Sequence, residues 1–191
     1  MSESSDYSPA PWAAGHDFAT NKRGYMDNVV ARGAVNPASI GLDPHNLAPD
    51  HLTCDCESPL VIACDVTGSM GVWPATIFSK LPYLEHEGKE YLGQDMQISF
   101  VAIGDANKSD RYPLQVRPFA AGADLKDSLE KLIVEGGGGG GGEESYDLAA
   151  LYYARNCEMP NAIRKPIFIF IGDEGIYNCI ENGIAERYAK V

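Results

Sequence analysis

Oxygen-bearing side chains follow a short apolar run in the first half of the chain. Leu60–Cys64 contains no charged residue, and Asp65, Thr67 and Ser69 come directly after it at alternate positions. A carboxylate and two hydroxyls without His or Cys are hard donors of the kind that Mg²⁺, Mn²⁺ and Ca²⁺ prefer. The pattern therefore predicts a divalent cation site. The simpler alternative is a strand-to-helix turn in which Asp or Ser caps the helix.

A second apolar run ends in acidic residues. Ile167–Ile171 is followed by Asp173 and Glu174. If both runs are neighbouring parallel strands, their carboxyl ends share one edge of the sheet, where ligands bind in open α/β folds. Asp65 and Asp173 would then lie close together and repel, and a divalent cation would relieve the repulsion. A capping Asp at the start of the next helix is the alternative.

A run of glycines precedes further acidic residues. Residues 136–142 are all Gly, and Glu143, Glu144 and Ser145 follow them. A flexible linker is one interpretation. A phosphate cradle is excluded because the Lys-Ser/Thr of a Walker loop is missing. Acidic residues and Ser also suit the N-terminus of a helix over 146–156, which explains them without any ligand.

The elements that position these residues follow from the hydrophobic pattern. The uninterrupted run Leu60–Cys64 predicts a strand buried on both faces of a parallel sheet. Strands are also expected over 97–104 and 114–119, and the link between them is too short for a crossover helix, so they should form an antiparallel hairpin. Helices are predicted over 73–84, where Pro82 ends or kinks the helix, and over 124–134, 146–156 and 177–191.

Residues 1–57 differ in composition from the rest of the chain. They are rich in Pro, Ala, Ser, Asn and Asp, and the prolines interrupt any long helix. We expect an N-terminal extension or wrapping arm over 1–57 and a single α/β domain over 58–191.

The motif Asp65-Val-Thr67-Gly-Ser69 resembles the Asp-x-Ser-x-Ser signature of von Willebrand factor A domains, which begins their metal ion-dependent adhesion site. Thr67 replaces the usual Ser and keeps the hydroxyl. Asp173 matches the Asp that follows the fourth strand of that family. The resemblance implies that these two Asp residues act mostly through bound waters.

The resemblance departs from the family pattern at the glycine-rich loop. That loop usually delivers a Thr or Asp ligand before a helix, and the matching position here falls on or near Gly141 or Gly142. Glu144 is our substitute candidate, with Glu143 and Ser145 behind it. The metal ligands that the resemblance implies are therefore Asp65, Thr67, Ser69, Glu144 and Asp173.

The resemblance also implies a fold and a function. The fold is a Rossmann-like open sheet, mostly parallel, with one antiparallel edge strand and helices on both faces. It covers about 58–191 and lacks the last strands, as in a C-terminally shortened domain of the bacterial intracellular type. The implied function is non-catalytic: a Mg²⁺ ion, or Mn²⁺ or Ca²⁺, recruits a carboxylate from a partner protein, and an adaptor role beside an AAA+ ATPase or in a multi-protein assembly is the context.

The sequence also offers two other functions. The first is a metal-free structural or assembly subunit, which the glycine loop and the shortened end favour. The second is a Mg²⁺-dependent phosphatase-like enzyme. That chemistry requires a second carboxylate two residues after the nucleophilic Asp65, where Thr67 stands, and a phosphoryl-binding Lys that is not evident near either strand end.

Composition limits the partners. A formal net charge of −12 argues against a nucleic-acid surface. No apolar stretch approaches the ~20 residues of a membrane span, and no secretory signal pattern is evident, so we expect a cytoplasmic protein without membrane contact. An odd number of Cys, five, suits reduced thiols. Cys54-Asp-Cys56 resembles half a metal site, but an ordinary loop is the simpler interpretation.

Overall fold

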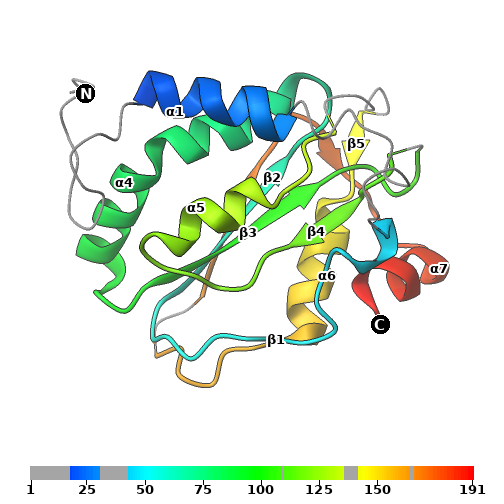
Figure 1. The fold of residues 1–191 in the computed structure, drawn as a ribbon. Coiled ribbons are helices and arrows are strands. Elements are labelled where there is room, and N and C mark those ends of the chain that lie inside the picture. Colours follow the sequence, from blue (N-terminus) through cyan, green and yellow to red (C-terminus); the bar gives the residue numbers. More distant parts are fainter. Residues whose placement is uncertain (1–17, 31–42, 109, 136–141, 164–165) are drawn as a thin grey trace.

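The computed structural model describes residues 18–30, 43–108, 110–135, 142–163 and 166–191. Four strands form the main sheet in the order β4-β3-β2-β7 (Figure 1). The strand β2 pairs in parallel with both β3 and β7, whereas β3 and β4 are antiparallel. The strands are β2 (Pro59–Asp65), β3 (Gln97–Ile103), β4 (Leu114–Val116) and β7 (Ile167–Ile171).

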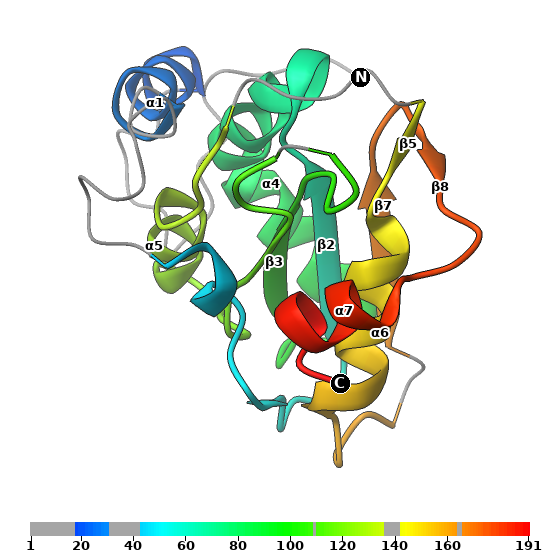
Figure 2. The ribbon, with the colours of Figure 1, turned by 90° about the vertical axis from the view of Figure 1, so that its right-hand side faces the viewer.

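Two short parallel pairs lie outside the main sheet. One joins β1 (Leu52–Thr53) to β6 (Cys157–Glu158), and the other joins β5 (Glu143–Glu144) to β8 (Gly175–Ile176). Figure 2 shows β5 and β8 side by side.

Helices cover both faces of the main sheet. One apolar core joins the sheet to α1, α4 and α5, and a second core on the other face joins it to α6 and the C-terminal turns. The α-helices are α1 (Phe18–Tyr25), α4 (Trp73–Leu92), α5 (Asp124–Glu130), α6 (Tyr146–Asn156) and α7 (Asn182–Ile184), and shorter 3₁₀ or π turns span Met26–Val30, Pro44–Asn46, Gly68–Val72 and Ala185–Ala189.

The central strand is buried throughout. Every residue of β2 is buried, with Leu60 and Ile62 in the core beneath α4 and Val61 and Ala63 in the core beneath α6. Successive side chains of a strand point to opposite faces, so an uninterrupted apolar run can supply two cores at once. The prediction of a doubly buried strand is confirmed.

The hairpin prediction is also confirmed. The strands β3 and β4 pair antiparallel, with Val101 opposite Val116, and β4 ends earlier than the expected residue 119. Beyond β4 the chain touches β3 again through an isolated bridge between Ile98 and Ala120. The sheet is thus mostly parallel with one antiparallel edge strand.

The helix α4 runs through Pro82, which corrects the prediction of a helix over 73–84 that ends near Pro82. The helix α4 continues to Leu92 and stops at Gly93, whose φ of 121° suits glycine alone. Leu81 and Pro82 are both buried. Packing on the sheet outweighs the loss of one helical hydrogen bond at Pro82.

The helix α5 is shorter than the predicted range 124–134. It ends at Glu130 because the backbone of Ile133 turns away to the side chain of Gln115: the Ile133 amide donates to the Gln115 Oε1, and Gln115 Nε2 donates to the Ile133 carbonyl, both at 2.8 Å. A side chain of β4 thus takes the place of the next helical turn.

The two ends of the chain also differ from the prediction. The expected helix over 177–191 is replaced by the short turns α7 and Ala185–Ala189. In the 1–57 extension, α1 was not predicted. It packs on α4, where the Tyr25 ring lies 4.9 Å from that of Phe78. The prediction of a helix over 146–156 is confirmed as α6.

These elements make a mixed α/β fold with an open, mostly parallel sheet that is compatible with a Rossmann-like arrangement. The described residues contain no helix with the length and apolar character needed to cross a lipid bilayer.

Candidate metal centre

The two acidic strand ends lie at the same edge of the sheet. The strands β2 and β7 are parallel, and Cys64 is in register with Ile171. Asp65 is the last residue of β2 and Asp173 comes two residues after β7, so both lie at the carboxyl ends of neighbouring strands. Asp65 is 1% exposed, whereas Asp173 is exposed to solvent. The two acids share an edge but differ in environment.

Asp65 is fixed by the turn that follows it. Its Oδ1 accepts hydrogen bonds from the Thr67 amide at 2.7 Å and from Thr67 Oγ1 at 2.8 Å. Gly68 has a φ of 42°, in the left-handed region that favours glycine, and it starts the 3₁₀ turn Gly68–Val72. The Asp-x-Thr-Gly sequence therefore folds the Thr67 hydroxyl back onto the carboxylate.

Glu144 reaches the same hydroxyl from β5. Thr67 Oγ1 lies 3.2 Å from Glu144 Oε1, across 77 residues of sequence. Glu144 is 1% exposed, and its second oxygen, Oε2, has no hydrogen-bond partner among the described residues. Pairing of β5 with β8 holds Glu144 at this position, since Glu144 is in register with Ile176.

The geometry leaves Glu144 short of hydrogen-bond donors. A hydroxyl has one hydrogen, so Thr67 cannot donate to Asp65 and Glu144 at the same time. Burial, with the nearby charge of Asp65 next in size, raises the pKa of Glu144 to about 8. At neutral pH Glu144 is therefore mostly protonated in the absence of a cation, and the protonated form can itself donate.

The pKa of Asp65 is also raised. Burial raises its pKa, the hydrogen bonds from Thr67 oppose that rise, and the charges of Asp173 and Asp110 add to it. Asp65 is thus harder to ionise than an exposed Asp.

Two further acidic residues lie near Asp65 and Glu144. Asp105 is buried after β3; its Oδ1 accepts from the Asn107 amide and its Oδ2 accepts from the Tyr177 hydroxyl at 2.8 Å. Asp110 is also buried, and its Oδ2 accepts from the Asp105 amide while its Oδ1 has no partner in the described structure. Asp65, Asp105, Asp110 and Glu144 are called the acidic cluster below.

Sequence reasoning missed three of the surrounding residues. These are Asp110, Tyr146 and Tyr177. The Tyr146 hydroxyl lies 3.5 Å from Asp65 Oδ2. Asp110 lies in the link between β3 and β4, where a polar residue is ordinary. The two tyrosines follow the two-residue strands β5 and β8, which no hydrophobic pattern predicts, so no local signal marks them.

The remaining predicted ligands have different outcomes. Ser69 lies in the turn Gly68–Val72, and its side chain is outside the described part of the structure. Glu143 lies in β5, so the two glutamates precede the helix in a strand and do not open it. Ser145 does not cap α6; its Oγ accepts a hydrogen bond from the Ala106 amide instead. Gly141 is outside the described residues.

The donor set has a clear chemical character. In the described part of the chain, no Lys or Arg forms an ion pair with any member of the acidic cluster. Within the same residues, no three His, Cys, Asp or Glu side chains converge closely enough to hold a metal by themselves. A cation here requires hydroxyl oxygens and water as well as carboxylates, which suits a hard ion such as Mg²⁺.

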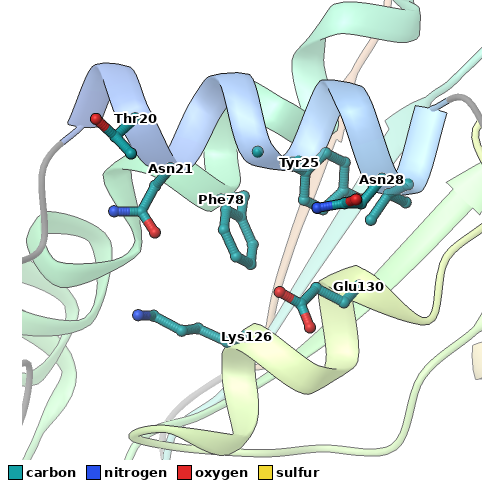
Figure 3. Close-up of a pocket in the computed structure, with 9 residues that line it drawn as sticks. Thr20, Asn21, Tyr25, Asn28, Phe78, Lys126 and Glu130 are labelled. Carbon is teal, nitrogen blue, oxygen red and sulfur yellow. The ribbon is translucent and has the colours of Figure 1, made fainter.

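Two hollows lie away from the acidic cluster. A cavity of about 330 Å³ is lined by α1, α4 and α5, with Asn21 of α1 and Lys126 and Glu130 of α5 around it (Figure 3). An apolar groove of about 250 Å³ lies between α4 and β7 and includes Trp73 and Ile169. Neither hollow includes a predicted metal ligand.

Comparison of the chain with protein-family models, with curated proteins and with solved structures finds no significant match.

Proposed function

We propose that the chain is a non-catalytic protein-binding module of von Willebrand factor A type, in which a divalent cation beside β2 recruits a carboxylate from a partner protein. The observation that supports this most strongly is the Thr67 hydroxyl between two buried carboxylates, Asp65 and Glu144. Buried charges without a basic partner are costly, and a cation removes the cost.

One oxygen of Glu144 indicates that the residues present suit a bound cation. Glu144 Oε2 is buried and unpaired in the described structure, as expected for an atom whose ligand is an ion. Thr67, Ser69 and Glu144 would hold the cation directly, and Asp65 and Asp173 would hold it through water. When bound, the cation supplies an open coordination position for a partner's Asp or Glu.

The protein's own residues organise that position. Asp65 orients the Thr67 hydroxyl through two hydrogen bonds, and the β5–β8 pair fixes Glu144 opposite it. The antiparallel edge strand β4 agrees with the sheet of the resembled family. An adaptor role beside an AAA+ ATPase or in a larger assembly is the proposed context, and it rests on analogy with that family.

Binding of Mn²⁺, measured by the electron paramagnetic resonance signal of the free ion, tests the proposal. The wild-type chain should bind one Mn²⁺, and Thr67→Val and Glu144→Gln should each weaken binding by about tenfold or more. Glu87→Gln, an exposed change on α4, is the matched control and should bind as wild type.

A second measurement tests the recruitment of a carboxylate. A peptide with one Asp should displace water from bound Mn²⁺ and lower its water-proton relaxation, whereas the same peptide with Asn should not. Equal response to both peptides would remove the proposed recognition step while leaving the metal site intact.

A metal-free structural subunit is the second candidate. The raised pKa of Glu144 favours it, because a protonated Glu144 can share a hydrogen bond with Thr67 without any ion. Absence of Mn²⁺ binding by a folded wild-type chain would support this candidate and exclude the first.

A further inference from the structure

Two cysteine thiols meet at the opposite end of β2 from the acidic cluster. Cys54 Sγ and Cys56 Sγ are 3.1 Å apart, and both residues are buried, at 1% and 4% exposed. We propose that Cys54 and Cys56 are a redox-active dithiol that a peroxide oxidises to a disulfide and that a small-molecule thiol reduces again. The proposal is independent of the metal site.

The local backbone explains why the two thiols meet. Burial alternates from Leu52 to Ser58, so that residues 52, 54, 56 and 58 face inward and Asp55 faces solvent. The segment is tied at both ends: the Cys54 amide donates to the Glu158 carbonyl, and the Ser58 hydroxyl donates to the Leu92 carbonyl. A bend begins at Cys56 and closes the distance between the two sulfurs.

The distance suits bond formation. A disulfide S–S bond is about 2.05 Å long, so the sulfurs need to approach by roughly 1 Å. The side chains already face each other, and no other element separates them. An ordinary buried cysteine differs: the Cys64 thiol donates to its neighbour's backbone carbonyl and has no second thiol beside it among the described contacts.

Oxidation of the pair takes two balanced steps. One of the two thiols attacks the peroxide: an S–O bond forms, the O–O bond breaks, and water leaves. The other sulfur then attacks the sulfenic acid; the S–S bond forms, the S–O bond breaks, and a second water carries away the proton of the attacking thiol. Burial, together with the hydrogen bond to Cys56, raises the pKa of Cys54 to about 12, which slows a step in which Cys54 attacks as a thiolate.

A third thiol limits the alternatives. Cys157 in β6 is in register with Leu52 and contributes to the electrostatic environment of Cys54. It is partly exposed. A disulfide between Cys54 and Cys157 is therefore the competing product, and the experiment must separate the two pairings.

Digestion after treatment with hydrogen peroxide separates them. Cleavage before Asp50, Asp55 and Asp65 gives the fragments 50–54 and 55–64, because Asp55 lies between the two cysteines. We expect these fragments to stay joined after oxidation and to separate after dithiothreitol. The link should be absent in Cys56→Ser and unchanged in the matched control Cys64→Ala.

Other products would overturn the proposal. These are a link from Cys54 to the fragment that contains Cys157, a link that persists in Cys56→Ser, and full alkylation of Cys54 and Cys56 after exposed Cys179 has been oxidised. Phenylarsine oxide, which bridges paired thiols, tests the wild-type chain. After it has reacted and the chain is alkylated in denaturant, Cys54 and Cys56 should both be protected from alkylation. Cys64 should be alkylated. Failure to protect the pair would also contradict the proposal.

Discussion

The neighbouring strands β2 and β7 carry similar sequences but have different environments. Each is a run of five or more apolar residues followed by an Asp, and the two pair in parallel along their length. Ile62 of β2 is 4% exposed, whereas its register partner Ile169 of β7 is 40% exposed. The difference arises because β2 has a strand on each side and β7 is the last strand of the described sheet.

The same difference extends to the acids at the strand ends. Asp65 is buried beside Thr67 and Tyr146, while Asp173 faces solvent. Apolar character alone thus does not report burial. Position in the sheet determines whether a strand forms core and whether its terminal carboxylate is desolvated.

The largest expected effect compares the paired isoleucines. Ile62→Ala should lower the free energy of unfolding by about 2–5 kcal/mol, because it leaves a cavity in a packed core. Ile169→Ala should cost about 1 kcal/mol, since much of that side chain is already in water. Urea denaturation measures both. Equal losses would contradict the assignment of β7 to an edge position.

Gly172 tests how closely the end of β7 approaches α6. A Cβ built on Gly172 would lie 1.8 Å from the Tyr146 hydroxyl oxygen, and the Tyr146 ring is held edge-on against Phe170 at 5.6 Å. Gly172→Ala should therefore destabilise the protein by about 1–3 kcal/mol.

Gly183→Ala is the matched control, because a Cβ there meets no atom within 4 Å. It should leave the thermal unfolding midpoint unchanged or slightly raised. Equal unfolding midpoints for the two variants would contradict the close approach between Gly172 and Tyr146.

Glu144 tests the consequence of desolvation. Its pKa rises from 4.5 to about 8 in the folded state, so between these pH values the folded chain binds more protons than the unfolded chain. Stability should therefore fall as pH rises from about 5 to 8, by about 3 kcal/mol, when divalent cations are removed with EDTA. Glu144→Gln should flatten this dependence in denaturation curves.

Added Mn²⁺ sharpens the same measurement. If the ion binds ionised Glu144, it should restore stability at pH 8 more than at pH 5 in wild type and have little effect in Glu144→Gln. A pH profile that is flat in wild type would show that Glu144 is not desolvated.

The smallest effect concerns the chain that follows β7. Tyr177→Phe removes the hydroxyl that donates to buried Asp105 Oδ2 and should cost about 1 kcal/mol. Tyr188→Phe is the control, since its ring packs on His45 and no hydrogen bond of its hydroxyl is recorded in the described structure. Chemical denaturation of both variants distinguishes a specific hydrogen bond from a general effect of removing a phenol oxygen.

Local patterns predicted much of the fold. The apolar run of β2 identified a buried strand, the short link after β3 identified an antiparallel hairpin, and helical spacing located α6. They failed where a distant contact decides the outcome: Gln115 ends α5 early, and packing on the sheet carries α4 through Pro82.

For the candidate site, the sequence by itself determined the residue types at the strand ends and the turn that joins Asp65 to Thr67, because both depend on neighbours within a few residues. Only the tertiary structure decided that Glu144 reaches Thr67 across 77 residues, that Asp110 and Tyr177 form hydrogen bonds with Asp105, and that Asp65 is buried while Asp173 is exposed. Those features depend on strand order and on the β5–β8 pairing, which bring together segments that are far apart in the chain. The sequence of one such segment does not predict its contact with the other.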